Sequence, residues 1–214
     1  MVIISGFCLT SCSNLNEYNQ TKLEQINYES YDGSNYETID KGPVKGGVLN
    51  IFSTLPDTLN PVLTNNIYVN CFSQFIFEPL VKLGRSQEPV PVLSDRWETS
   101  ADGKIWTFHI RDKVMWHDGK PFTAEDVEYT VNTILSAGNK SIYKKNLQNI
   151  ASFAAIDSSN FRVNLIKPNS FTAEMMTFPI IPKHYYADKN QDDEGHFITP
   201  IGTGPYKFES YKAD

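Results

Sequence analysis

Four histidines are the side chains in this sequence best suited to acid–base or metal chemistry: His109, His117, His184 and His196. His117 stands directly before Asp118, and an imidazole beside a carboxylate is a pairing that general acid–base catalysis uses. Imidazole nitrogens also bind nickel, zinc and copper. The four histidines are widely spaced, and no H-E-x-x-H motif, Walker A loop or nucleophile elbow is present. The sequence therefore predicts neither a catalytic centre nor a metal site, unless the fold gathers the histidines.

Three cysteines, Cys8, Cys12 and Cys71, show no metal-ligand spacing. Residues 1–12 are predicted to be the end of a lipoprotein signal peptide, because they form a short apolar run, although without a basic start, and end in Leu-Thr-Ser-Cys. This ending resembles a lipobox, in which the cysteine, here Cys12, receives a diacylglycerol and becomes the mature N-terminus. The alternative is a short buried strand with an ordinary cysteine. Cys71 has apolar neighbours and is predicted to be a small buried hydrophobe.

The length and charge of the chain exclude several classes of protein. A chain of 214 residues can bury a core and form one or two domains. The net charge of −6 argues against a nucleic-acid partner. No apolar run reaches eighteen residues, so no membrane-spanning helix is expected. Residues 13–45 are polar and lack an apolar period, which is typical of a flexible spacer.

The stretch 93–127 contains the clearest local structure, beginning with a turn and a strand. Asp102-Gly103 is a tight-turn dipeptide, because glycine accepts a positive φ at no steric cost. After the turn, Trp106, Phe108 and Ile110 alternate with polar residues, which is the period of a half-buried strand.

A second turn and a helix follow in the same stretch. Asp118-Gly119 predicts the turn, and Thr123 predicts a helix start, because its hydroxyl can reach the amide of Asp126 in a capping box. Val127, Val131 and Ile134 then follow at the spacing of one helical face.

Weaker patterns elsewhere predict further elements. Apolar residues at helical spacing predict a helix over 69–77, and alternation predicts a strand over 161–165. Residues 46–52 are predicted to form the first strand of the folded region, 171–178 a short helix, and 201–208 a turn into a strand with Tyr206 and Phe208 facing inward.

The stretch 93–127 resembles the signature of the bacterial extracellular solute-binding proteins of family five, the peptide and nickel receptors of ABC importers. The matching positions are Trp97, Asp102, Gly103, Trp106, Phe108, Arg111, Val114, Trp116, His117, Asp118, Gly119, Thr123, Ala124, Asp126 and Val127. The F-E-P-L run at 77–80, the I-P-K-H run at 181–184 and the G-T-G-P-Y-K-F run at 202–208 also match the family. One position departs from it: Lys113 stands where the family usually has glycine, and a change in the local turn is expected.

The resemblance implies candidate ligand contacts. In peptide-binding relatives the loop before the first helix lines the ligand cleft and pairs with the peptide main chain. Counting between landmarks places these contacts at Asn65 and Ile67, and Asn66 between them is also a candidate ligand-binding residue. The alternative is a solvent-facing loop that caps the next helix. Relatives also carry a cleft tyrosine near Tyr143, although this residue could equally be a packing tyrosine.

The resemblance covers Gly46–Phe208 and implies an α/β fold of the periplasmic-binding-protein-like II class. Receptors of this class have two lobes that close on a ligand by hinge motion. The chain corresponds to the first lobe, with mixed sheets and flanking helices, and the second lobe is absent. We expect 46–78 and 198–214 to form a core subdomain, with 79–197 as an inserted subdomain.

The resemblance also implies a function. It predicts a substrate-binding lipoprotein that captures oligopeptides or dipeptides outside the membrane, as an extracellular or periplasmic protein, and delivers them to an ABC permease. Its partners would be the peptide, the permease and, through the lipid anchor, the membrane; it would need no cofactor and would not be an enzyme. Two alternatives stay open: a receptor for a nickel chelate or an oligosaccharide on the same scaffold, and a truncated product without transport activity.

Overall fold

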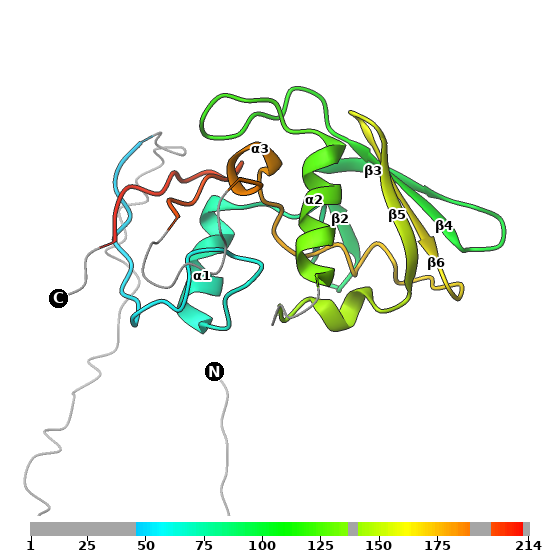
Figure 1. The fold of residues 1–214 in the computed structure, drawn as a ribbon, viewed down its shortest axis with the longest axis horizontal. Coiled ribbons are helices and arrows are strands. Elements are labelled where there is room, and N and C mark those ends of the chain that lie inside the picture. Colours follow the sequence, from blue (N-terminus) through cyan, green and yellow to red (C-terminus); the bar gives the residue numbers. More distant parts are fainter. Residues whose placement is uncertain (1–45, 137–140, 189–197, 212–214) are drawn as a thin grey trace, which may run out of the picture. The chain divides into compact units, whose positions relative to one another are not determined.

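A computed structural model describes residues 46–136, 141–188 and 198–211 (Figure 1). The chain divides into two units, Met1–Val48 and Leu49–Asp214, and the fold described below is that of the second. The predicted signal peptide with Cys12, the predicted spacer 13–45, and His196 lie outside the described residues.

A four-stranded antiparallel sheet forms the body of this unit, in the order β3-β4-β6-β5. The strands are β3 (Ser94–Thr99), β4 (Ile105–Ile110), β5 (Ile150–Asp157) and β6 (Asn160–Leu165). The alternation predicted for β4 is confirmed, because Trp106, Phe108 and Ile110 are all buried while the residues between them are not. The predicted turn before β4 is present as well, with Gly103 at a φ of 68°.

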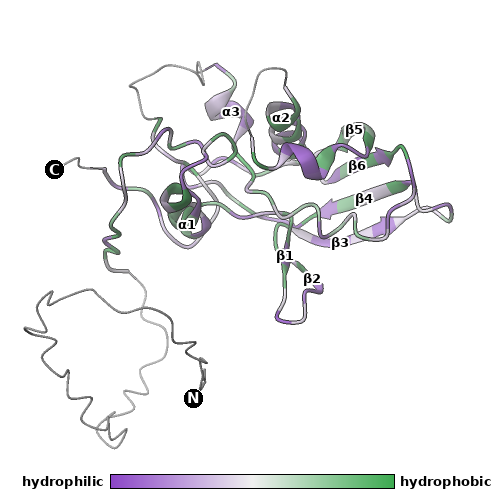
Figure 2. Ribbon diagram, turned by 90° about the horizontal axis from the view of Figure 1, so that it is seen from below, coloured by the Kyte–Doolittle hydropathy of each residue, from purple (hydrophilic) through white to green (hydrophobic). Residues whose placement is uncertain are grey.

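Helix α2 (Ala124–Leu135) covers one face of the sheet, lying over β5 and β6 (Figure 2). The predicted capping box is present at its start, where the Asp126 carboxylate accepts the Thr123 amide at 2.9 Å. The predicted apolar face is confirmed, since Val127, Val131 and Ile134 are fully buried. Burial of these side chains holds the helix on the sheet.

Asp126 makes further bonds that tie neighbouring segments to α2. One carboxylate oxygen accepts the indole N–H of Trp116 at 3.2 Å, and the other accepts the amide of Lys183 at 2.9 Å. The residue is almost fully buried. Burial is the largest influence on the carboxyl and raises the pKa of Asp126, although the hydrogen bonds oppose that change.

The remaining elements are short. Helix α1 (Ile67–Ile76) lies in the region of the predicted helix 69–77, and a small antiparallel pair is formed by β1 (Val81–Leu83) and β2 (Pro89–Pro91). The 3₁₀ helix η2 (Lys144–Leu147) and the helix α3 (Lys183–Tyr186) complete the described part of the fold. In the described ranges no helix has both the length and the hydropathy to cross a membrane.

Three predicted elements are wrong. Residues 46–52 form no strand, because a strand needs a neighbour for its amides and carbonyls, and the described residues offer them none. Residues 171–178 form turns instead of a helix, with amide bonds that reach back only three residues, such as Met176 to Ala173. Residues 201–208 also form no strand; Phe208 is half-buried, but Tyr206 is 41% exposed and packs edge-on against Phe75.

Lys113, which stands where the family usually has glycine, has a strained backbone conformation. Lys113 has a φ of 61°, in the left-handed region that glycine adopts freely. The turn therefore holds lysine in a backbone conformation that favours glycine. A side chain in this conformation costs roughly 1–2 kcal/mol.

We predict that Lys113→Gly stabilises the protein. Relief of the strain exceeds the extra chain entropy of glycine in the unfolded state, so a net gain of about 0.5–1 kcal/mol is expected. Urea unfolding should show a higher midpoint with an unchanged slope. Lys113→Ala is the matched control, because it removes the charge and keeps the strain; equal midpoints for the two variants would contradict the prediction.

Candidate ligand-binding surface

The loop before α1 is organised around the carboxylate of Asp57. This carboxylate accepts the hydroxyl of Thr64 and the amides of Asn65 at 2.8 Å and Thr58 at 2.9 Å. Partial burial raises the pKa of Asp57, but the three hydrogen bonds outweigh burial, and the pKa is lowered. The backbone of the loop is thus held in one shape by an ionised side chain.

Asn66 is the N-cap of α1. Its side-chain oxygen accepts the amides of Tyr68 at 2.9 Å and Val69 at 3.4 Å, which satisfies donors that the first turn of a helix leaves free. Its side-chain nitrogen donates to Thr54 Oγ1 and to the Leu55 carbonyl, both at 3.1 Å. Both ends of the Asn66 amide therefore serve the protein itself, which agrees with the capping alternative.

The two residues beside this cap are available to a ligand. Asn65 is exposed, and Ile67 is 69% exposed. An asparagine side chain offers donors and an acceptor, and Ile67 offers an apolar contact. They are the two residues that the resemblance predicts as ligand contacts.

Tyr143 lies apart from this pair in the packing of the protein. It precedes η2, and its ring packs against Phe178 at 6.3 Å between centroids. Burial raises the pKa of Tyr143. Figure 1 shows α1 separate from the 3₁₀ turn that follows α2, so the predicted residues are not brought into one cluster.

The structure has an exposed apolar face on and around α1, whose residues the sequence analysis did not identify. Ile67, Cys71 and Phe75, which follow one another at four-residue spacing, are exposed together on α1. Phe52 and Leu55 of the preceding segment are also exposed, at 82% and 72%. The prediction that Cys71 is buried is wrong: Val69, Ser73 and Ile76 occupy the core side of the helix. The four-residue spacing was the available signal for this second face.

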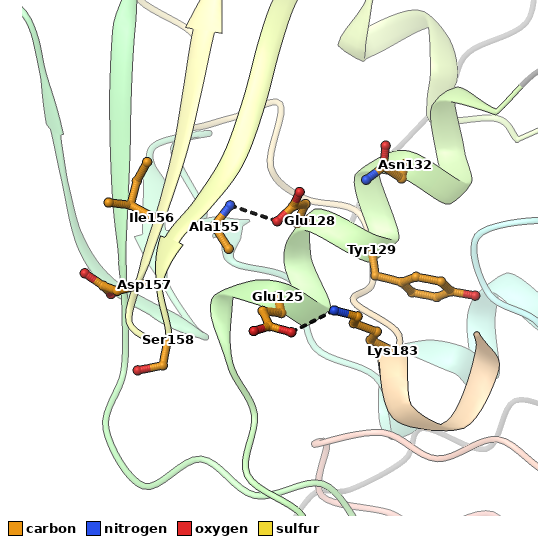
Figure 3. A pocket seen from close by; sticks show the side chains of 9 residues that line it. All are labelled: Glu125, Glu128, Tyr129, Asn132, Ala155, Ile156, Asp157, Ser158 and Lys183. Atoms are coloured by element: carbon orange, nitrogen blue, oxygen red, sulfur yellow. Dashed lines mark hydrogen bonds and ion pairs between the residues drawn. The ribbon is translucent and has the colours of Figure 1, made fainter. Parts of the chain in front are cut away.

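A shallow pocket of about 470 Å³ lies between α2 and β5 (Figure 3). Its charged groups already have partners within the protein: Glu125 pairs with Lys183 at 2.7 Å, and Glu128 accepts the amide of Ala155 at 3.0 Å. Figure 3 marks both contacts, one joining α2 to β5 and the other joining α2 to α3. Their arrangement serves to fasten α2 to its neighbours.

The described histidines, His109, His117 and His184, form no metal-binding cluster. His184 Nε2–H donates to the Asp118 carboxylate at 2.7 Å, and the His117 ring bonds to the backbone of Gly202 and Gly204. Within the described ranges no three His, Cys, Asp or Glu side chains are placed to hold a metal ion. The acid–base pair considered for His117 and Asp118 is not among the hydrogen bonds of the described residues. His117 bonds to Gly202 and Gly204 instead, and Asp118 to His184.

We predict that the amide proton of Asn65 reports the charge of Asp57. Its resonance in a ¹H–¹⁵N spectrum should shift as the carboxyl titrates, with a midpoint below about 3.9, the ordinary value for aspartate. Because the folded pKa is lowered, the stabilisation is present above that ordinary value and is lost as the pH falls through the folded pKa.

Two variants make this measurement specific. Asp57→Asn should abolish the shift, whereas Asp102→Asn, in the turn before β4, should leave it unchanged. A midpoint above the ordinary value, or a shift that survives in Asp57→Asn, would contradict the role of Asp57.

Comparison with known proteins identifies the class to which this fold belongs. The model superimposes on NikZ from Campylobacter jejuni in complex with Ni(L-His), with a TM-score of 0.65 and 28% identity over 75% of this chain and 32% of that chain. Such neighbours are type II periplasmic binding proteins, and the described residues correspond to part of one lobe.

The family model for bacterial extracellular solute-binding proteins, family 5 Middle, matches residues 88–214, more than half of the chain. The oligopeptide-binding protein OppA of Bacillus subtilis is 32% identical over 77% of this chain and 34% of its own length. The dipeptide-binding protein of Escherichia coli is 31% identical over 74% of this chain and also 34% of its own length. This chain therefore belongs to the family 5 extracellular solute-binding proteins, and it spans about a third of the length of these relatives.

Proposed function

We propose that this chain is the ligand-capturing part of a substrate-binding protein that takes up peptides outside the membrane and delivers them to an ABC permease. The observation that carries the proposal is the similarity to the oligopeptide- and dipeptide-binding relatives over three quarters of the chain. The proposed activity is binding without chemical conversion of the ligand.

The proposed contacts are Asn65, Ile67 and Tyr143. A peptide main chain presents alternating N–H and C=O groups, which the exposed amide of Asn65 can match. The apolar face beside it can cover peptide side chains, since small-ligand sites are mostly apolar with a few polar groups that fix orientation. Asn66 supports this surface by holding the loop to the start of α1.

The proposed arrangement places 46–78 and 198–214 in a core subdomain and 79–197 in an inserted one. Backbone bonds between the end of α1 and residues 204 and 206 support this proximity of the two outer ranges. A second lobe would close over the ligand and supply the contacts that this chain lacks.

A chelated metal is the second candidate ligand, favoured by the structural neighbour that holds Ni(L-His). A chelate carries its own donor atoms, so this candidate does not require the cluster of metal-binding side chains that the described residues lack. A receptor for an oligosaccharide is a further candidate, and no contact in the described residues favours it.

We predict that this chain alone binds peptides only weakly. Small-ligand sites bury about 70–90% of the ligand surface, and one open face supplies about half of that enclosure. Each ~1.4 kcal/mol lost is a tenfold loss of affinity, so a micromolar receptor falls to the millimolar range. Calorimetry of the 214-residue chain with a mixture of di- to pentapeptides, and separately with Ni(L-His), measures this and compares the two ligand classes.

The control for that titration is a pair of variants. Asn65→Ala with Ile67→Ala should remove the residual peptide signal, whereas Glu125→Gln, in the pocket between α2 and β5, should not change it. Micromolar binding would show that one face suffices. Binding of Ni(L-His) without peptide binding would favour the second candidate.

We also predict lipidation of Cys12. The chain expressed in a bacterium with its own leader should incorporate labelled palmitate and sediment with membranes, because the Leu-Thr-Ser-Cys ending precedes a polar spacer. Cys12→Ala should lose both the label and the membrane fraction, whereas Cys8→Ala should keep them. Retention of label in Cys12→Ala would exclude the lipobox.

A further inference from the structure

The turn at His117 is fixed to the body of the fold. The Trp116 amide bonds to the Lys120 carbonyl at 2.8 Å, and the Gly119 amide bonds back to Trp116 at 2.9 Å. The indole of Trp116 is buried against Phe122, with ring centroids 5.4 Å apart. His117 therefore projects from a rigid support.

His117 bonds to a distant part of the chain at several points. Its amide donates to the Gly202 carbonyl at 2.9 Å, and its own carbonyl accepts Lys207 Nζ at 2.9 Å. In the ring, Nδ1 lies 3.3 Å from the Gly202 amide nitrogen and Nε2 lies 2.8 Å from the Gly204 carbonyl oxygen.

The partners of the ring permit only one protonation state. The Gly202 amide can only donate, so Nδ1 must present its lone pair. The Gly204 carbonyl can only accept, so Nε2 must carry the hydrogen. His117 is thus a neutral imidazole with its single proton on Nε2.

The segment that His117 holds also ends helix α1. The last carbonyls of a helix have no partner within it. Here the amides of Gly204 and Tyr206 supply partners to Ile76 at 2.8 Å and Phe75 at 3.0 Å. A Cβ on Gly202 would collide with the Ile76 carbonyl oxygen, so the segment passes directly over the end of the helix.

A second proton on the ring would undo this arrangement. It would place an N–H of His117 against the N–H of Gly202, turning an attraction into a repulsion. The neighbouring charges are the Lys207 ammonium, Lys120, and Asp118, whose carboxylate is already engaged by His184 at 2.7 Å.

We propose that His117 is a proton-sensitive bridge: in its neutral Nε2–H form it binds Gly202 and Gly204, whose segment covers the end of α1, and protonation loosens that segment. The bridge is a property of the fold and does not depend on which ligand is bound.

The test is ¹⁵N NMR of the 214-residue chain without ligand. At about pH 7.5 the His117 ring should show a hydrogen on Nε2 and none on Nδ1, as expected for a neutral imidazole. Between about pH 7.5 and 5 the hydrogen-exchange protection of Gly202, Gly204 and Tyr206 should fall roughly tenfold relative to amides in β4 and β6. A hydrogen on Nδ1 at neutral pH, or unchanged relative protection, would overturn the proposal.

Two variants isolate the residue responsible. His117→Gln has both an acceptor and a donor and no titration in this range, so the protection of Gly202 and Gly204 should no longer change with pH. His184→Gln, which alters the neighbouring histidine, should keep the wild-type response. A pH response that persists in His117→Gln, or disappears in His184→Gln, would assign the effect to another group. If His117→Gln does not fold, the proposal is tested by the position of the hydrogen on the wild-type His117 ring and by the pH response of His184→Gln.

Discussion

The structure depends on a single buried carboxylate, that of Asp126. Its two oxygens accept hydrogen bonds from the start of α2, from the Trp116 indole and from the first amide of α3. A buried carboxylate is costly unless it is well bonded, and the raised pKa shows that burial still dominates. The Asp126 carboxylate accepts from three separate segments, so it holds α2, the aromatic turn and α3 together. The aromatic turn then positions His117.

Local patterns predicted the elements that are stable for local reasons. Two predicted patterns are confirmed, because in each the apolar side chains face the same core. They are the alternation of Trp106, Phe108 and Ile110 and the helical spacing of Val127, Val131 and Ile134. The strands expected at 46–52 and 201–208 are wrong, since a strand also needs a partner, and the amides of Gly204 and Tyr206 bond to helix carbonyls instead. The pattern within one segment does not show which distant groups its amides and carbonyls will bond to.

The candidate surface was only partly predictable. Counting from motif landmarks predicted contacts at Asn65 and Ile67, which are exposed, but it could not separate them from Asn66, whose side chain caps α1 and bonds to the preceding segment. The capping role of the loop could be recognised only from all of its hydrogen bonds, including the one between Thr64 and Asp57, seven residues earlier. Cys71 was misplaced because α1 has apolar residues on two faces, and composition alone does not show which one meets the core.

The joint between α1 and the segment after Pro200 consists of main-chain atoms, with carbonyls of Phe75 and Ile76 facing amides of Tyr206 and Gly204. Main-chain atoms are the same in every protein, so this joint can persist while the surrounding side chains diverge, provided that small residues keep the backbones close. Relatives with different named ligands are only 28–32% identical to this chain over the aligned residues. A joint of this kind lets one scaffold change its ligand preference through evolution without redesigning how its parts are connected.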